Sequence, residues 1–209
     1  MVRSKSNIDV MLVTKYLDDE SFRQLDHFYK LDGVGYGENR WPQLSQRLSV
    51  KDERPFYFIG PLQLKQMKKY KDTLANKVVS IASIWRDQHL RWLCQHAPQK
   101  SVLLQINGAN RVEQGGVDLA EVASVLVKWR DKVEIKGVMS FGIRDNIKQS
   151  IALYQRIIQK AKEEEWFPNG GVFSLGMSLD WYETIEGCHA LLGQNDRLLL
   201  RVGRYIMSD

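Results

Sequence analysis

The chain has 209 residues, 44% of them hydrophobic and 26% charged, and a formal net charge of +5. This size and composition predict one globular domain over residues 1–209 with a core that needs no disulfides. The chain begins without a secretory signal, holds two distant cysteines and has no run near the ~18 apolar residues of a membrane span, so we expect a cytoplasmic protein. The basic residues are spread along the chain, and their densest cluster, Lys65, Lys68, Lys69 and Lys71, has no ladder of stacking aromatic residues, which argues against a nucleic-acid partner.

Short apolar runs recur along the chain, and an amphipathic or charged stretch follows each of them. The runs cover residues 10–13, 33–36, 56–59, 78–84, 102–106, 137–141, 172–175 and 198–202. Continuous apolar strands that alternate with amphipathic helices indicate a parallel sheet covered by helices. Eight such strands is the number at which a parallel sheet closes into a (β/α)₈ TIM barrel, so this α/β fold is the prediction. An open, doubly wound sheet is the competing architecture.

Two of the intervening segments have a clear helical period. Residues 118–129 place Leu119, Val122, Val125 and Leu126 on one face, with Asp118 as the expected N-cap. Residues 146–166 do the same with Ile147, Ile151, Tyr154, Ile158 and Ala161. The stretch 187–197 before the last strand contains two glycines and a polar tail, and we expect it to be partly loop.

Functional groups of such a barrel lie at the carboxyl ends of the strands, where the loops converge. Lys15 stands at the end of the first apolar run, where an ammonium group is costly to bury unless it is paired or modified. A partly desolvated lysine has a lowered pKa and can attack a carbonyl group as the neutral amine. The alternative interpretation is a lysine whose ammonium group reaches out of the barrel mouth into solvent.

A second feature points to an anion. Ser178 lies at the turn after the seventh run and Gly203 follows the eighth, the two strands that often build a phosphate site in TIM barrels. Ser178 is also a plausible helix N-cap, which would require no ligand. No phosphate loop, dinucleotide-binding glycine pattern, nucleophile elbow or metal-ligand spacing is present in the sequence.

Several segments, in order along the chain, resemble the pyridoxal phosphate homeostasis proteins, single-barrel relatives of the alanine racemase N-terminal domain. The similar segments are Val-Met-Leu-Val-Thr-Lys ending at Lys15, Gly-Tyr-Gly-Glu-Asn ending at Asn39, Phe-Ile-Gly-Pro-Leu-Gln over 58–63, Ser-Leu-Gly-Met-Ser-Leu-Asp over 174–180, and Leu-Arg-Val-Gly ending at Gly203. The chain departs from the family pattern after Lys15, where a second lysine and a proline are missing, and at Arg204, where a small hydroxyl residue is usual.

The resemblance implies a pyridoxal 5′-phosphate (PLP) site. Lys15 would form the Schiff base, and Arg201 would face the pyridine nitrogen and keep it unprotonated, which makes the ring a weaker electron sink. The remaining residues implied in cofactor binding are Asn39 and Met177 near the ring, and Ser178, Gly203 and Arg204 at the phosphate.

The leading functional hypothesis is therefore a non-catalytic, monomeric PLP carrier that acts in intracellular PLP homeostasis and serves PLP-dependent apoenzymes. A PLP enzyme of the same fold type, a racemase or a decarboxylase, is the second hypothesis. Racemisation needs bases on both faces of the cofactor, and we expect no room for a second domain in these 209 residues. A degenerate barrel that serves as an interaction module is the third.

Overall fold

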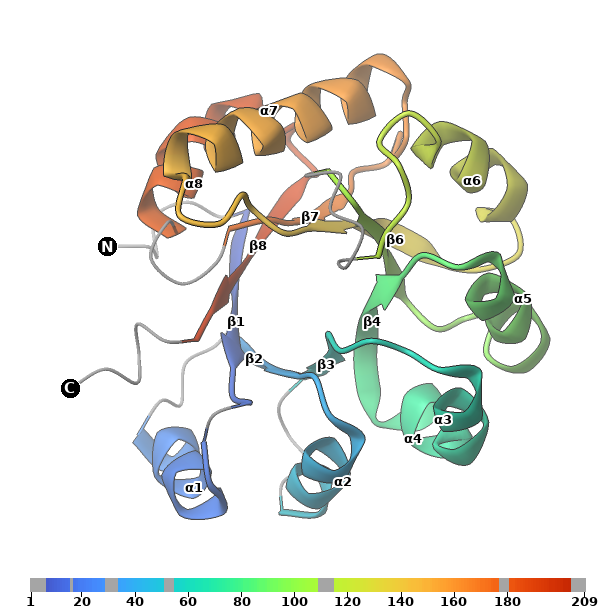
Figure 1. Ribbon diagram of the computed structural model, residues 1–209, viewed down its shortest axis with the longest axis vertical. Helices are drawn as coiled ribbons and strands as arrows, with labels where there is room; N and C mark the ends of the chain where they lie inside the picture. The colour runs from blue at the N-terminus through green and yellow to red at the C-terminus, as the bar shows by residue number, and fades with distance from the viewer. Residues whose placement is uncertain are drawn as a thin grey trace.

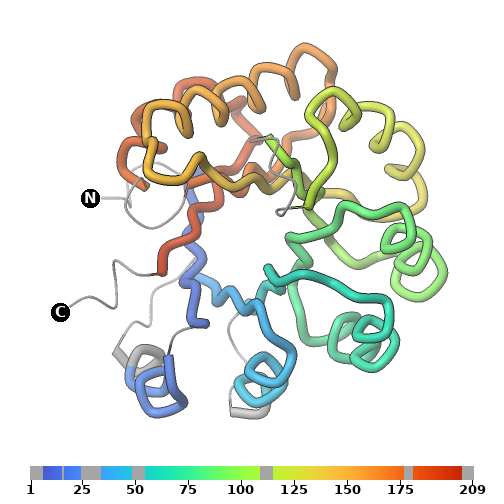
Figure 2. Tube along the Cα trace, viewed as in Figure 1, coloured from blue at the N-terminus to red at the C-terminus, as the bar shows by residue number. Residues whose placement is uncertain are grey.

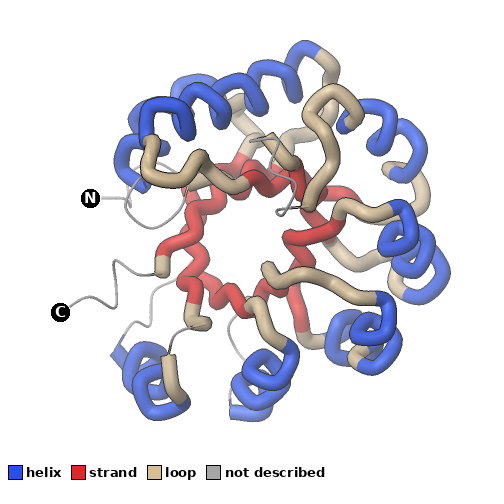
Figure 3. The backbone as a smooth tube through the Cα atoms, in the orientation of Figure 1, coloured by secondary structure: helices blue, strands red, loops and turns tan. Residues whose placement is uncertain are grey.

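The computed structural model describes residues 7–15, 17–28, 34–50, 55–108, 115–176 and 181–203, without the side chains of 25–28 and 49–50. In these ranges, eight parallel strands form a closed barrel in sequence order, as the ring in Figure 3 shows. The strands are β1 (Ile8–Val13), β2 (Val34–Glu38), β3 (Phe56–Phe58), β4 (Val78–Ile84), β5 (Val102–Ile106), β6 (Ile135–Ser140), β7 (Val172–Ser174) and β8 (Arg197–Val202). The predicted TIM barrel is confirmed, and the open-sheet alternative is wrong because β8 pairs with β1.

Helices follow the strands and surround the barrel (Figures 1 and 2). They are α1 (Asp19–Phe28), α2 (Trp41–Val50), α3 (Leu64–Lys69), α4 (Lys71–Asn76), α5 (Asp87–His96), α6 (Val122–Trp129), α7 (Ile147–Glu163), α8 (Trp181–Cys188) and the 3₁₀ helix η3 (His189–Leu191). Among the described residues, no helix combines the length and apolar character needed to cross a membrane.

Most of the core lies between the barrel and its helices. Outward-facing strand residues such as Leu12, Phe56 and Leu200 are 6% exposed or less and pack against the apolar faces of the helices. On α2, the Trp41 ring stacks on Phe58 at 4.2 Å, which ties the helix to the neighbouring strand. This packing fixes α2 beside the carboxyl ends of the first strands.

The barrel interior has its own small core. It is formed by residues that face inward from five strands: Met11, Ala82, Leu103, Met139 and Leu199. Gly37 of β2 leaves room for the first of these, because a Cβ there would lie 2.5 Å from the Met11 sulfur. The glycines of the Gly-Tyr-Gly segment thus serve packing inside the barrel. These buried side chains fill the interior of the barrel between its strands.

Two predicted helices differ in detail from the structure. The helix predicted at 118–129 begins at Val122, and the Asp118 carboxylate instead accepts a hydrogen bond from the Ala120 amide in the preceding turn at 2.8 Å. In α7, Asn146 is the N-cap and accepts from the Gln149 amide at 3.0 Å. Ile147, expected on the buried face, is 42% exposed, because it lines an open groove between α7 and α8.

The segment 187–197 is only partly loop, as predicted. Cys188 ends α8 and η3 follows it, so the irregular part starts at Leu192. The Asp196 carboxylate accepts hydrogen bonds from the amides of Gly171 at 2.9 Å and Gly193 at 2.7 Å. These contacts orient the chain for its entry into β8.

Candidate functional site

Lys15 lies where the carboxyl ends of β1, β2 and β8 meet. It follows β1 in a turn, and its side chain is exposed. The neighbouring Thr14 amide donates to the Gly37 carbonyl of β2 at 3.2 Å, and on the other side a Cβ on Gly203 would lie 3.3 Å from Val13. The described part of the mouth therefore places an accessible primary amine between the ends of three adjacent strands.

A buried ion pair lies directly behind this turn. The Arg47 guanidinium of α2 and the Glu38 carboxylate at the end of β2 form a salt bridge, with 2% and 0% of their side chains exposed. The Thr14 hydroxyl donates to the same Glu38 oxygen. Arg47 also donates to two backbone carbonyls, Thr14 at 2.8 Å and Leu17 at 2.7 Å. One guanidinium thus contacts the chain on both sides of Lys15.

The Glu38 carboxyl group is in a mixed electrostatic environment. Burial raises its pKa, while the hydrogen bond from Thr14 and the positive charge of Arg47 oppose that rise. Its second oxygen, Oε2, has no hydrogen-bond partner among the described residues. Removing Arg47 alone would leave a buried carboxylate without its counter-charge.

Arg201 reaches across the mouth from β8 to β6. Its Nη1 donates to the carbonyl and the hydroxyl of Ser174, at 3.0 and 3.1 Å, and its Nη2 donates to the Ser140 carbonyl at 2.6 Å. The guanidinium carbon lies 5.2 Å from the centre of the Phe141 ring, and the residue is 3% exposed. These contacts hold a planar cation in a fixed orientation near the carboxyl ends of β6, β7 and β8.

Asn39 stands at the end of β2, next to Glu38. Its Oδ1 is buried and has no hydrogen-bond partner among the described residues. Its backbone packs so closely on Gly60 that a Cβ there would lie 2.0 Å from the Asn39 carbonyl oxygen. The Ser83 hydroxyl donates to the Gly60 carbonyl at 2.6 Å, which fixes the loop after β3. Asn39 therefore has a constrained backbone and an amide oxygen open to a further donor.

The structure thus places four of the seven predicted site residues at one end of the barrel: Lys15, Asn39, Arg201 and Gly203. Met177, Ser178 and Arg204 lie outside the described residues. The predicted phosphate site, which rests mainly on Ser178 and Arg204, therefore stays a prediction.

Sequence reasoning missed the residues that support the site. Arg47 lies three residues after Leu44 and one before Leu48, both buried on α2, so an arginine on an apolar helix face was the available signal. Ser140 and Ser174 end apolar strands and gave no signal of their own. Their role depends on the barrel bringing the ends of β6 and β7 within reach of Arg201 on β8.

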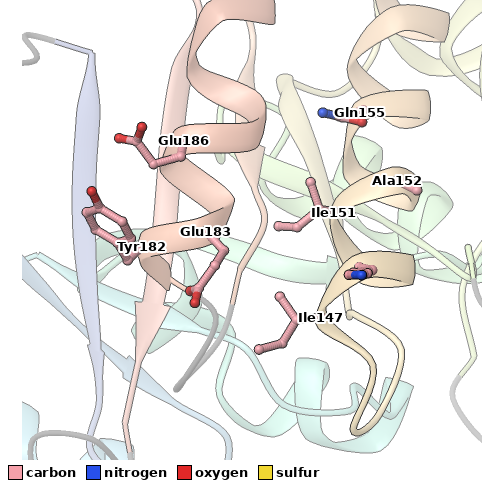
Figure 4. Close-up of a pocket in the computed structure, with 8 residues that line it drawn as sticks. Ile147, Ile151, Ala152, Gln155, Tyr182, Glu183 and Glu186 are labelled. Atoms are coloured by element: carbon pink, nitrogen blue, oxygen red, sulfur yellow. The ribbon is translucent and has the colours of Figure 1, made fainter.

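Hollows between the surrounding helices lie outside the barrel mouth. A groove of about 400 Å³ runs between α7 and α8, where Ile147 and Ile151 point toward α8 and Tyr182, Glu183 and Glu186 belong to the opposite helix (Figure 4). A second hollow of about 590 Å³ lies between α5 and α6, and Trp85, Asp87 and Trp129 contribute to its lining. Neither hollow is lined by any of the predicted site residues.

The closed barrel and the exposed lysine after β1 define the chain as a single β/α barrel with a primary amine at the carboxyl end of its strands. The sequence alone matches no family model and no curated protein.

Several solved structures resemble this barrel over nearly its whole length. PipY of Synechococcus elongatus without PLP aligns with a TM-score of 0.76 at 17% identity, covering 96% of this chain and 93% of PipY. PipY with PLP bound aligns at 0.75 and 17%, covering 99% and 96%. A lysine/ornithine decarboxylase of Vibrio vulnificus in complex with putrescine aligns at 0.75 and 12%, covering 98% of this chain but 59% of the enzyme. At these identities the likeness establishes the fold.

Proposed function

We propose that this chain binds PLP through a Schiff base to Lys15 and acts as a PLP-holding protein in intracellular PLP homeostasis. The observation that carries the proposal is the exposed Lys15 amine, held at the carboxyl end of β1 by a buried network and accompanied at the same mouth by the fixed Arg201 guanidinium. Membership of the pyridoxal phosphate homeostasis family, suggested by the ordered sequence segments, is part of the same proposal. PipY, which has been solved with PLP bound, has the same barrel over 96% of its own length.

The described residues fit such a ligand. When bound, PLP supplies an aldehyde that condenses reversibly with a primary amine. Lys15 offers that amine in an accessible position, because its side chain is exposed while its backbone is anchored. Asn39 has a buried amide oxygen without a partner among the described residues, and it can accept a hydrogen bond from a bound group. Gly203 lies after β8, is buried next to Val13 and adds no side chain of its own to the mouth.

In this proposal, the positive charge of Arg201 governs the protonation of the pyridine nitrogen of PLP. Its Nη atoms are engaged with Ser140 and Ser174, so the guanidinium keeps its place and its positive charge. A cation beside the pyridine nitrogen disfavours protonation of that nitrogen and so weakens carbanion stabilisation. This favours a holder of PLP over a racemase or a decarboxylase. Ser178, Gly203 and Arg204 complete the proposal as the phosphate-binding residues, with Met177 next to the ring.

The partners in this proposal are PLP and the apoenzymes that receive it, and the chain acts as a monomer. An open mouth suits exchange, because reversible condensation allows release to another lysine.

The test is a titration of the purified protein with PLP, followed by visible absorption. We expect a visible imine band in the wild type and none in Lys15→Ala. Lys68→Ala is the matched control, because Lys68 is an exposed lysine on α3, and this variant should keep the band. No band in the wild type, or an undiminished band in Lys15→Ala, would refute the proposed function. Robust amino-acid turnover would overturn the carrier role.

A further inference from the structure

We infer that Arg47 and Glu38 are positioning residues for Lys15, acting through the backbone of the turn that carries it. The inference rests on the proposed function only in assigning the ligand to Lys15. The role of the ion pair in holding the turn stands on the geometry of the apoprotein.

The hydrogen bonds from Arg47 to the backbone on both sides of Lys15 are called the clamp below. Arg47 Nη1 donates to the Thr14 carbonyl at 2.8 Å, one residue before Lys15, and Nη2 donates to the Leu17 carbonyl at 2.7 Å, two residues after it. The Leu17 amide closes the same turn by donating to the Thr14 carbonyl at 3.0 Å. The turn is therefore fixed by a guanidinium from another element, 30 to 33 residues further along the chain.

Glu38 holds the guanidinium in place. It accepts from Arg47 and from the Thr14 hydroxyl through the same oxygen, so strand end, helix and turn share one acceptor. The Phe22 ring lies 4.6 Å from the guanidinium carbon, so α1 also packs against the clamp. With this support, the guanidinium cannot leave the two carbonyls without disrupting its own ion pair.

Stability alone does not account for the ion pair. A buried ion pair usually contributes little compared with apolar residues of the same volume, because both charges lose their hydration. Helix α2 is already anchored by Trp41, Leu44 and Leu48, which are 3%, 0% and 6% exposed. What apolar side chains cannot do is donate hydrogen bonds to the carbonyls of Thr14 and Leu17. The specific contribution of the pair is to the geometry of the turn, and a preorganised amine binds its ligand with a smaller entropic loss.

The experiment compares Arg47→Met with the double variant Glu38→Gln/Arg47→Met. The single variant leaves a buried carboxylate without its counter-ion, and the double variant removes both charges at nearly constant volume. Two readouts are taken: exchange of the Leu17 amide hydrogen in the apoprotein by NMR, and PLP affinity from the visible band. The matched control is Leu44→Ala, which also destabilises α2 but removes no hydrogen bond to the turn.

We expect the Leu17 amide to exchange about tenfold faster in both Arg47 variants, while the double variant recovers much of the stability that the single variant loses. PLP affinity should fall about tenfold in both, and Leu44→Ala should change neither readout by more than about twofold. Unchanged Leu17 exchange in Arg47→Met would overturn the inference. So would a double variant in which exchange recovers together with stability, because the pair would then be only structural. If the wild type itself shows no visible band, the proposed function fails, while the exchange rates still decide whether the clamp exists.

Discussion

At the scale of single residues, the site is built from charges that the barrel holds in fixed positions. Lys15 is exposed while the chain around it is anchored by Arg47, and Arg201 is buried while its two Nη atoms donate to Ser174 and Ser140. The two cations at the mouth therefore differ in role. One side chain is exposed at the mouth, and the other is buried among the ends of β6, β7 and β8.

Arg201 should not tolerate replacement by lysine. Lysine keeps the charge but cannot donate from two nitrogens in the fixed geometry that reaches both Ser174 and Ser140. Leaving buried carbonyls without donors costs about 1–3 kcal/mol, so Arg201→Lys should lower the free energy of unfolding by this amount. Urea unfolding measures the change.

The control is Arg91→Lys on α5, where the arginine side chain is 67% exposed and its salt bridge to Asp87 lies at the surface. This variant should stay within ~0.5 kcal/mol of the wild type. Equal effects of the two substitutions would show that the contacts of Arg201 do not support the barrel.

The sequence can locate those site residues that directly follow a predicted strand. Lys15 and Asn39 could be located because each follows an apolar run, and the ends of parallel strands meet at one edge. Arg47 could not, because its role depends on α2 packing against a turn that lies far away in the sequence. The signal from Arg47 was only that a charged residue interrupts an apolar helix face.

At the scale of elements, α5 carries a buried histidine that makes stability depend on pH. His89 is 0% exposed. Burial, with the nearby charge of Arg86, lowers its pKa to about 4 from a usual value of 6.5. In the pH range between these values, the unfolded chain binds a proton that the folded protein does not.

The free energy of unfolding should therefore decrease as the pH falls from about 6.5 to about 4. Replacing His89 with phenylalanine, which has no titratable group, should make this decrease less steep. Urea unfolding of wild type and variant at several pH values in this window provides the comparison. Identical slopes would mean that His89 is protonated as readily in the folded protein as in the unfolded chain.

The N-termini of α6 and α7 differ in a way that can be measured. Asn146 caps α7 by accepting from the Gln149 amide, whereas Glu121, at the N-cap of α6, makes no such side-chain bond. Asn146→Ala should cost about 1 kcal/mol of unfolding free energy, as the loss of a cap usually does. Glu121→Ala is the matched control, with an expected change below ~0.5 kcal/mol in thermal or urea unfolding. A comparable loss in both would contradict the assignment of the cap.

At the scale of the whole molecule, the barrel follows from the spacing of the apolar runs. All eight predicted runs overlap strands, because parallel strands that are covered by helices are mostly apolar. Closure could only be suggested by their number, since it depends on β8 pairing with β1. An ion pair between Asp9 and Arg197 joins these two strands near their starts, with Arg197 Nε donating at 2.6 Å.

Helix boundaries were less predictable than strands. Asp118 has the chemistry of an N-cap, but it stabilises the turn before α6. The sequence pattern cannot distinguish these two uses of a carboxylate, because in both it accepts a hydrogen bond from an amide two or three residues later. The exposure of Ile147 likewise depends on the spacing of α7 and α8, which leaves a groove between them.

The central claim is that this barrel holds PLP on one particular lysine. Borohydride reduction of the PLP-treated protein, followed by peptide mapping with mass spectrometry, tests it most directly, because reduction converts the Schiff base into a stable bond at the lysine that carried it. The account predicts one pyridoxyl group per chain, on Lys15. A label spread over exposed lysines such as Lys65 and Lys68, or its absence from Lys15, would contradict it.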